Sequence, residues 1–300
     1  MIDAAPRRIA FLGFGLIAGS IARALAEPSG DRLALVAWSP SGAGPRAALA
    51  DRILDAAAAD PAAAIEGADL VVIAAPPLET IDLIARLGGP LRGALAPDVV
   101  VTDVASTKAA VLAEADAVGV RFVGGHPMAG REVVGYAGSV ADLFVDRPWV
   151  VVPGAAADDA AIRRVEWLAR STGARPVSMD ATVHDAAAAA VSHLPLVLAV
   201  ALVEAVVGGD AERPGWPVAA GLAASGWRDM TRLARGDARM GAGIAATNAP
   251  ALLAAVGEVR AALDAWIADL EQAGGPDPER LEARLRRARE RLERAPTTRS

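Results

Sequence analysis

The feature that most constrains the fold is a glycine-rich turn close to the N-terminus. A short apolar run, residues 8–12, leads into Gly13 and Gly15, and an apolar helical pattern follows. With Ala18 in the third position, this is a GxGxx(G/A) sequence between a strand and a helix. Gly13 permits the tight turn, Gly15 lets the backbone approach a pyrophosphate, and Ala18 allows close packing of helix on strand. The turn predicts a dinucleotide-binding unit, the alternative being a turn that needs glycine for its shape alone.

The choice of dinucleotide depends on the end of the second predicted strand, residues 33–38. An acidic residue usually stands there and binds the ribose hydroxyls. This chain has Ser39 instead, followed by Pro-Ser-Gly. No carboxylate is present to repel a 2′-phosphate, and no arginine is immediately adjacent, Arg46 being the nearest candidate. We expect NAD as cofactor, with NADP not excluded.

Strand and helix patterns alternate through the first half of the chain. Such alternation at this spacing is typical of βαβ units and a parallel sheet. We therefore predict an α/β, Rossmann-type, doubly wound and mostly parallel sheet as a dinucleotide-binding domain over residues 1–179. Its further strands are expected at 69–77, 98–103, 121–124, 149–152 and 175–178, with helices at 78–87 and 107–117.

The character of the chain changes after Met179. Long Ala-rich stretches without alternation predict helices at 180–207, 216–235, 249–272 and 277–294. The last has Asp277 as N-cap and Pro278 at the first helical position. We expect an all-α domain over residues 180–300 that forms a substrate wall and a dimer interface.

Composition excludes several classes of protein. The net charge is −6 and no basic block is present, so nucleic acid is not an expected partner. The chain has no cysteine, which removes disulfides and thiolate chemistry. The most apolar run, residues 194–207, is broken by Pro195 and Glu204 and is too short to span a bilayer. We expect it to be a buried helix, with no membrane partner and no signal peptide, in a cytoplasmic protein.

Three polar motifs interrupt this apolar background. His126 stands in FVGGHPMAGREVVG, expected to be a loop directly after a short strand; Ser106 and Lys108 stand in VTDVASTK; His193 stands in VSHLP. Histidine titrates near neutral pH and suits proton transfer. Taken singly, His126 and His193 could each be structural, and Ser106 could be a helix N-cap.

Together these motifs resemble the prephenate dehydrogenase family, which includes arogenate and cyclohexadienyl dehydrogenases. A fourth motif, GWRDMTRLA around Arg232, matches the family pattern as well, and the resemblance runs from about residue 8 to 248. It implies NAD(P)-dependent oxidative decarboxylation of prephenate, or of arogenate, in tyrosine biosynthesis. By the same resemblance, His126 bonds the ring hydroxyl, with Ser106 and His193 beside it. Arg232 binds a substrate carboxylate, and Glu132 is an acidic residue close behind His126.

The chain departs from the family pattern at two places. The family often has a second histidine where this chain has Leu196, and residues 236–241 lack a tryptophan that many relatives carry. Lys108, the single lysine beside 29 arginines, is expected in local structure or at the rim of the site. His184, nine residues before His193, could support the site or cap a helix.

Two other functions remain open at this point. A 3-hydroxyacid dehydrogenase would use a lysine in its helical half, but this chain has no lysine after Lys108. A noncatalytic dinucleotide-binding protein would give His126, Ser106 and Arg232 no joint purpose. No metal-spaced cluster is present, so no metal is expected.

Overall fold

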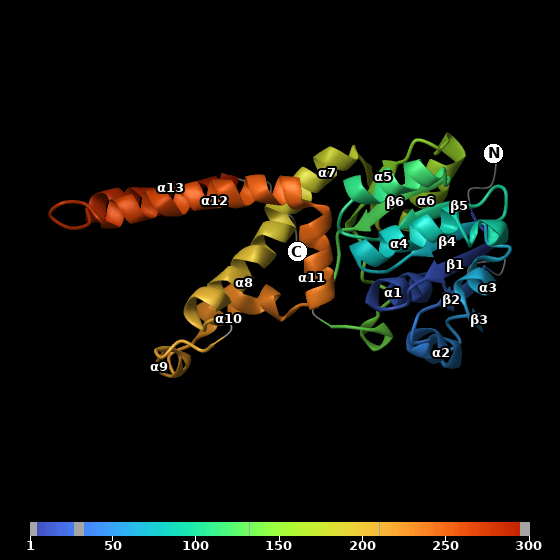
Figure 1. The fold of residues 1–300 in the computed structure, drawn as a ribbon, viewed down its shortest axis with the longest axis horizontal. Helices are drawn as coiled ribbons and strands as arrows, with labels where there is room; N and C mark the ends of the chain where they lie inside the picture. Colours follow the sequence, from blue (N-terminus) through green and yellow to red (C-terminus); the bar gives the residue numbers. More distant parts are fainter. Residues whose placement is uncertain (1–4, 27–32, 132, 210, 295–300) are drawn as a thin grey trace. The chain divides into compact units, whose positions relative to one another are not determined.

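A computed structural model describes residues 5–26, 33–131, 133–209 and 211–294. Within them lies an eight-stranded sheet of order β3-β2-β1-β4-β5-β6-β7-β8 (Figure 1). The neighbouring strands from β3 through β2, β1, β4 and β5 to β6 all pair in parallel. β6 pairs antiparallel with β7, and β7 pairs in parallel with β8. The strands are β1 (Arg8–Leu12), β2 (Ala34–Trp38), β3 (Ala56–Ala57), β4 (Leu70–Ile73), β5 (Val100–Asp103), β6 (Phe122–Pro127), β7 (Pro148–Pro153) and β8 (Arg175–Ser178).

Helices cover both faces of this sheet. One face packs on α1 (Leu16–Leu25), α2 (Ala43–Ala50) and α6 (Asp159–Ser171). The other packs on α3 (Pro61–Ile65), α4 (Pro77–Gly88) and α5 (Ala109–Val118). The central strand β4 is apolar at every position because both of its faces are buried. The doubly wound, mostly parallel sheet is therefore confirmed; β3, α2, α3 and α6 are additions to the elements expected from sequence.

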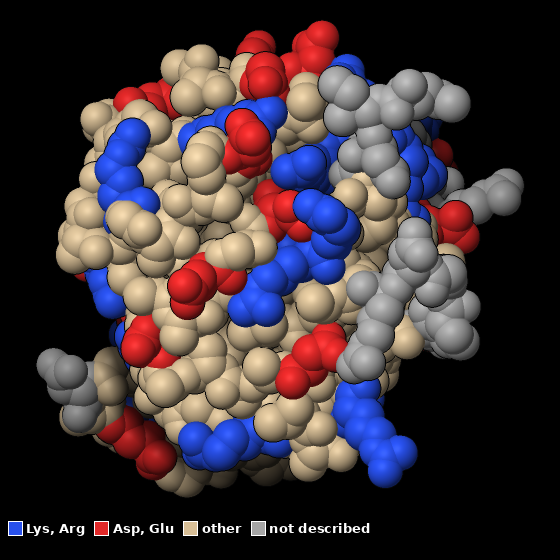
Figure 2. All heavy atoms as spheres, turned by 90° about the vertical axis from the view of Figure 1, so that its right-hand side faces the viewer, with Lys and Arg blue, Asp and Glu red and all other residues tan. Residues whose placement is uncertain are grey.

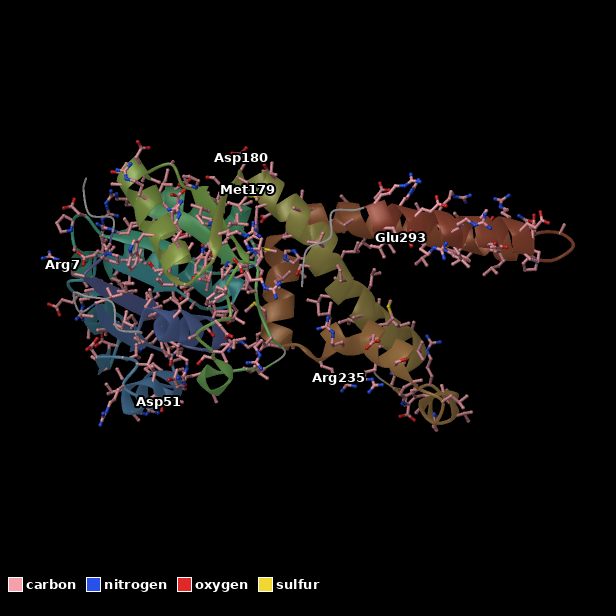
Figure 3. The ribbon with its side chains drawn as sticks, turned by 180° about the vertical axis from the view of Figure 1, so that it is seen from behind. Arg7, Asp51, Met179, Asp180, Arg235 and Glu293 are labelled. Atoms are coloured by element: carbon pink, nitrogen blue, oxygen red, sulfur yellow. The ribbon has the colours of Figure 1, made fainter. Side chains whose placement is uncertain are left out.

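A series of helices follows β8, beginning at Met179 and Asp180 (Figure 3). Its elements are α7 (Ala181–Ala188), a π-turn (Ala189–His193), α8 (Leu194–Val206), α9 (Trp216–Ala220), α10 (Ser225–Thr231), a 3₁₀ turn (Arg232–Arg235), α11 (Ala238–Thr247), α12 (Ala249–Leu270) and α13 (Pro278–Arg294). The single helix expected at 216–235 is wrong: it is two short helices and a 3₁₀ turn. Its sequence carries glycines at 221 and 226, and glycine disfavours a continuous helix.

The chain divides into two compact units, one ending at Leu252 and the other starting at Leu253. In the second unit, Asp269 of α12 forms ion pairs with Arg280 and Arg284 of α13. Asp277 accepts hydrogen bonds from the backbone N–H groups of Glu279 and Arg280, which confirms the expected N-cap of α13. The functional boundary between residues 179 and 180 stays a prediction.

The apolar stretch in α7 and α8 is not the buried helix expected from sequence. Residues Ala181–Val206 are helical over 26 residues, and an 18-residue window within them has a mean hydropathy of 2.2, yet only 22% of that window is buried. By length and composition alone this stretch could cross a membrane. This is weak evidence, because the core helix of a soluble protein passes the same test. Asp185 near its start is hydrogen-bonded to the N-terminus of α5, so that end is fixed to the sheet unit.

Charges of both signs are distributed over the surface shown in Figure 2. Basic and acidic side chains are interspersed there.

Candidate active site

His126 lies inside β6 rather than in the loop expected from sequence. β6 pairs with β5 only at Phe122 and Val123, whereas its antiparallel pairing with β7 continues through Pro127. The strand therefore extends past the carboxyl end of β5 and carries His126 beyond it. His126 is 8% exposed. Open α/β sheets bind ligands beyond the carboxyl ends of their strands, and this is where His126 stands.

The glycines before His126 are required by close packing. A Cβ on Gly125 would lie 2.6 Å from the Asp103 carbonyl oxygen and 3.0 Å from Nε1 of Trp149. The backbone N–H of Gly125 donates to Oδ1 of Asp103 at 3.0 Å. β5 thereby fixes the backbone position from which His126 projects.

Lys108 is buried beside the same carboxylate rather than at the rim of the site. Its Nζ forms an ion pair with Oδ2 of Asp103, and both side chains are fully buried. The same oxygen accepts the backbone N–H of Ala105 at 2.9 Å. Burial lowers the pKa of the Lys108 amine, and the Asp103 carboxylate opposes that shift. Asp103 and Lys108 therefore hold the turn that contains Ser106.

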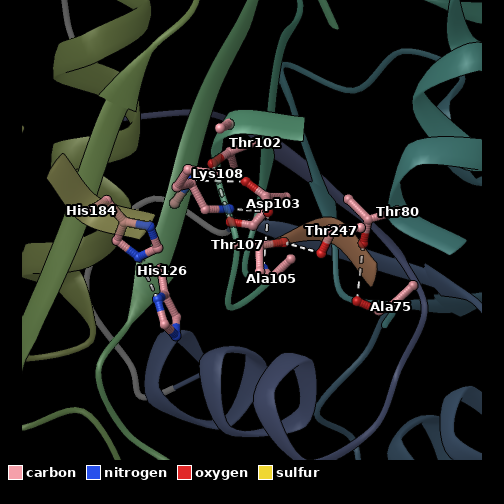
Figure 4. Close-up of polar contacts among 12 residues, drawn as sticks. Ala75, Thr80, Thr102, Asp103, Ala105, Thr107, Lys108, His126, His184 and Thr247 are labelled. Atoms are coloured by element: carbon pink, nitrogen blue, oxygen red, sulfur yellow. Dashed lines mark hydrogen bonds and ion pairs between the residues drawn. The ribbon is translucent and has the colours of Figure 1, made fainter. Parts of the chain in front are cut away.

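His126 pairs with a second histidine (Figure 4). Nδ1 of His126 lies 2.8 Å from Nε2 of His184, and Nδ1 of His184 lies 2.7 Å from Oδ1 of Asp185. Asp185 also accepts the backbone N–H groups of Lys108 at 2.7 Å and Ala109 at 2.9 Å. The N-terminus of α5 is thus capped by a carboxylate from α7. Ser106 is not the N-cap, a place taken by Lys108.

His193 faces this cluster from the π-turn. Its Nδ1 lies 3.1 Å from Nδ2 of Asn248, which also donates to the Asp185 carbonyl oxygen at 2.8 Å. Nδ2 is a donor, so Nδ1 of His193 accepts, and a neutral ring carries its proton on Nε2. That Nε2 is buried, and no group in the described ranges lies within hydrogen-bond geometry of it.

The π-turn brings His184 and His193 to one site. Nine residues make about two and a half turns of a straight α-helix, which would place the two rings on opposite sides. A π-turn has more residues per turn and is common at functional sites. His184 therefore supports His126 and does not cap a helix.

Burial favours the neutral form of two site histidines, His126 and His193, by lowering the pKa of each. Burial lowers the pKa of His126 well below its usual 6.5, and positive charge on Lys108, His184 or His193 acts in the same direction. Burial also lowers the pKa of His193, against opposing effects of the Asp185 carboxylate and the Ser106 backbone. Ser106, half-buried, is thus beside His193, and the predicted residues His126, Ser106 and His193 lie in one cluster.

The dinucleotide loop has the features that its sequence predicts. Gly13 has φ +89°, and a Cβ there would lie 2.3 Å from the Ala74 carbonyl oxygen. A Cβ on Gly15 would meet nothing within 4 Å, so open space faces that residue. α1 begins directly after Gly15 with no capping side chain, and Ala18, in the first turn of α1, is fully buried. An uncapped helix N-terminus beside open space fits a pyrophosphate.

The end of β2 carries Ser39, half-buried, in a tight loop. The Ser39 carbonyl accepts the Gly42 N–H at 3.0 Å, and the Arg46 guanidinium donates to the Ser41 carbonyl at 3.0 Å. Arg46 therefore folds back over the loop that follows the strand.

Of the two remaining predicted residues, Arg232 and Glu132, the structure describes only the first. Arg232 is exposed on the 3₁₀ turn after α10, where the neighbouring Thr231 is buried and bonds the Trp227 carbonyl. Glu132 lies outside the described residues. A cavity of about 360 Å³ lies among α8, the 3₁₀ turn and α11, and Leu196 lines it together with Glu204 and Asp237. None of His126, Ser106 or His193 lines this cavity, and its carboxylates do not suit an anionic ligand.

Sequence reasoning missed three residues that build the site: Asp103, Asp185 and Asn248. The signal for Asp185 was available, because a His-Asp pair is unusual in an Ala-rich helix and buried polar groups need partners. Asn248 ties α11 to the cluster, as does the 2.8 Å bond between the Thr107 and Thr247 hydroxyls. Among the described residues, no group of three metal-ligating side chains is arranged to hold an ion.

Comparison with known proteins gives two adjoining family matches. Residues 21–178 match the model described as prephenate dehydrogenase, nucleotide-binding domain. Residues 180–286 match the model described as prephenate dehydrogenase, dimerization domain. The first match begins after the Gly13–Gly15 turn, so the assignment of that turn depends on its own geometry.

Individual relatives agree with the family matches. The prephenate dehydrogenase of Bacillus subtilis is 31% identical, over 88% of this chain and 68% of the relative. The cyclohexadienyl dehydrogenase of Zymomonas mobilis is 32% identical, over 89% and 87%. The crystal structure of Synechocystis arogenate dehydrogenase superposes with a TM-score of 0.75 at 28% identity, over 95% of this chain and 99% of that one.

Proposed function

The chain belongs to the prephenate dehydrogenase family, and from this premise we propose that it catalyses the NAD-dependent oxidative decarboxylation of prephenate to 4-hydroxyphenylpyruvate. The observation that carries the proposal is the buried His126 beyond the carboxyl end of β5, beside Ser106 and His193, where burial lowers its pKa. The relatives give no support to a noncatalytic dinucleotide-binding protein. The reaction belongs to tyrosine biosynthesis in this family.

The cofactor has a suitable place in the chain. Gly13, Gly15 and the N-terminus of α1 would hold its pyrophosphate, Ala18 lets α1 pack closely, and Ser39 would face the adenosine ribose. When bound, the nicotinamide supplies the acceptor for the hydride that leaves the hydroxyl-bearing ring carbon.

His126 is the proposed proton acceptor. As hydride leaves, the ring hydroxyl loses its proton, and the ring carboxylate departs as CO₂ to give the aromatic product. A neutral imidazole has one unprotonated nitrogen that can take this proton. The site favours that state, because burial and nearby cationic groups hold the pKa of His126 low.

Ser106 and His193 complete the contacts around the reacting carbon. Among the described residues, the buried Nε2–H of His193 has no partner at hydrogen-bond geometry, so a substrate oxygen would suit it as an acceptor. Ser106 offers a half-buried hydroxyl on the turn held by Asp103. Together they would fix the substrate against His126.

Arg232 is proposed to bind a substrate carboxylate. A guanidinium pairs with a carboxylate through two parallel hydrogen bonds, and the substrate is a dianion. Glu132 is proposed as an acidic group at the edge of the same site. These two assignments are supported by the motif match.

Arogenate is the second candidate substrate. It differs from prephenate in an amino group where prephenate has the side-chain keto group, and the similar Synechocystis structure is an arogenate dehydrogenase. The residues around His126 would contact the ring, which is the same in both substrates, so they do not distinguish prephenate from arogenate.

We infer that the enzyme is a homodimer. The second family match is described as a dimerization domain. Many large apolar side chains in the helical half are exposed, among them Val191, Val218, Leu222 and Met230. A homodimer interface would cover such surface. A cytoplasmic location is proposed with the function, because both substrate and cofactor are soluble metabolites.

One assay tests the function. Purified protein is incubated with NAD or NADP and with prephenate or arogenate, and the absorbance of the reduced cofactor is followed. Reduction that requires one of the two substrates supports the proposal. No reduction with either substrate and either cofactor contradicts it.

A further inference from the structure

The described residues place a carboxylate and two histidines in a line that ends at His126. Nδ1 of His126 lies 2.8 Å from Nε2 of His184 (Figure 4). Nδ1 of His184 in turn lies 2.7 Å from Oδ1 of Asp185. His184 is 2% exposed and Asp185 is 4% exposed. The function proposed above uses only His126, so the other two residues need an explanation.

Asp185 is held as an ionised acceptor. Burial by itself would raise the pKa of its carboxyl, but hydrogen bonds from His184 and from the Ala109 and Lys108 backbone outweigh burial and lower it. Both of its oxygens accept backbone N–H groups at the start of α5. An ionised carboxylate has no proton to donate, so Nδ1 of His184 is the donor in their contact.

The position of the proton on His184 then determines the position of the proton on His126. A neutral His184 that carries its proton on Nδ1 has a lone pair on Nε2. Nδ1 of His126 faces that lone pair at 2.8 Å and must therefore donate. A neutral His126 with its proton on Nδ1 has its free lone pair on Nε2, the only remaining ring nitrogen.

We propose that His184 and Asp185 are positioning residues that fix the tautomer of His126, so that its Nε2 faces the substrate hydroxyl as an acceptor. This inference rests on the proposed function for its catalytic consequence, but the tautomer itself does not. Asp185 also caps α5, next to the turn that carries Ser106. One carboxylate thus sets both the proton on His126 and the place of Ser106.

Other charged or titratable groups face this line from neighbouring elements. Lys108 and Asp103 form their ion pair beside it, and His193 faces it from the π-turn. A cation at His184 would put a proton on Nε2 of that ring, force His126 to accept through Nδ1 and leave His126 with its proton on Nε2. That arrangement offers the hydroxyl no acceptor, and the experiment below distinguishes it.

The direct test is the ¹⁵N spectrum of the ring nitrogens. The chain has three histidines, so histidine-selective labelling gives three ring systems, each assigned by a single-site variant. We expect His126 and His184 both to be neutral and protonated on Nδ1 at pH 7.5. A His126 ring protonated on Nε2, or a charged His184, would overturn the proposal. This measurement needs neither substrate nor turnover, so it stands even if the proposed function fails.

The catalytic consequence is tested with a pair of variants at His184. His184→Gln keeps an acceptor toward His126 and a donor toward Asp185, whereas His184→Leu removes both. We expect His184→Leu to lower kcat by about 10² or more, by analogy with the loss on wrong-tautomer substitution in catalytic triads, with KM for the substrate and Kd for NAD little changed. His184→Gln should restore most of kcat.

A purely structural role for His184 makes a different prediction. It would lower the melting temperature in both variants, leave the His126 tautomer unchanged, and reduce kcat to a similar degree in both. Equal kcat in His184→Gln and His184→Leu would overturn the catalytic part. A matched control is Asp158→Asn, at an N-cap that bonds the Ala161 N–H at 2.8 Å and contacts Arg121 but no histidine. This control should leave kcat and all three ring spectra unchanged.

Discussion

Nδ1 of His126 lies 2.8 Å from Nε2 of His184, although the two histidines are 58 residues apart and come from different parts of the fold. His126 projects from a strand of the sheet, and His184 projects from the first helix after it. The contact joins the region expected to bind the dinucleotide to the region expected to bind the substrate. The predictions below depend on that junction or on the residues around it.

Replacing His126 should mainly slow the chemical step. His126→Ala removes the proton acceptor, and loss of general base catalysis typically costs a factor of about 10² to 10⁴. We expect kcat to fall by that factor while Kd for NAD, measured by titration, stays nearly unchanged, since the Gly13 turn is separate. Wild-type kcat in His126→Ala with both prephenate and arogenate would refute the central assignment.

Activity should fall on the acid side of neutrality, but at a lower pH than free histidine would give. The reaction needs neutral His126, because an imidazolium has no lone pair to accept a proton. Burial, with the nearby cationic groups, holds the pKa of His126 well below 6.5, so the neutral form persists as pH drops through 6.5. We expect kcat to stay level down to about pH 6.5 and to fall only below it. The measurement is the profile of kcat against pH. A fall in kcat centred at or above about pH 6.5, or one that persists in His126→Ala, would contradict this account.

Arg232 should affect substrate binding more than turnover. If it holds a carboxylate equally in the ground and transition states, Arg232→Ala raises KM and leaves kcat nearly intact. We expect KM for prephenate to rise by about tenfold or more, as loss of a charged hydrogen bond costs roughly 1.5–3 kcal/mol. Arg235→Ala, on the same 3₁₀ turn, is the matched control. An equal effect of the two substitutions would show that Arg232 acts only through general charge.

Cofactor preference should be incomplete and adjustable at one position. Ser39 provides no carboxylate against a 2′-phosphate, so we expect NAD use with measurable NADP activity. Ser39→Asp should increase the NAD preference in kcat/KM by about tenfold, equivalent to ~1.4 kcal/mol. Ser39→Ala, which removes the hydroxyl without adding charge, is the control. A wild-type preference for NADP above tenfold would reverse this expectation.

The protein should be a dimer at micromolar concentration. Light scattering should give twice the chain mass of 30.5 kDa. The exposed apolar side chains of the helical half, such as Leu222 at 80% exposure, require cover in water. A stable monomer at that concentration would argue against the inferred interface.

The fold was largely predictable from sequence because its strong signals are local. The run Leu70–Ile73 is apolar at every position, as a strand buried on both faces must be, and Gly13 marks a turn that other residues cannot adopt. The two-residue strand β3 was missed because it is too short to have a pattern. The helix expected at 216–235 was wrong because glycines interrupt it.

The site was predictable only in part, because its geometry depends on contacts distant in sequence. The motifs identified His126, Ser106 and His193, which lie in one cluster. Nothing local indicates that β7 extends β6 past His126, and so the histidine was placed in a loop. Nor does sequence spacing reveal the π-turn Ala189–His193, without which His184 and His193 would lie on opposite sides of a helix. The roles of Arg232 and Glu132 stay predictions.

The burial of Lys108 has a practical consequence for chemical modification. It carries the chain's single ε-amine, which is enclosed and paired with Asp103. In the folded protein, reagents that acylate amines therefore find the one lysine side chain enclosed. Acylation of Lys108 by a fluorophore or biotin ester would therefore report that the sheet unit had opened.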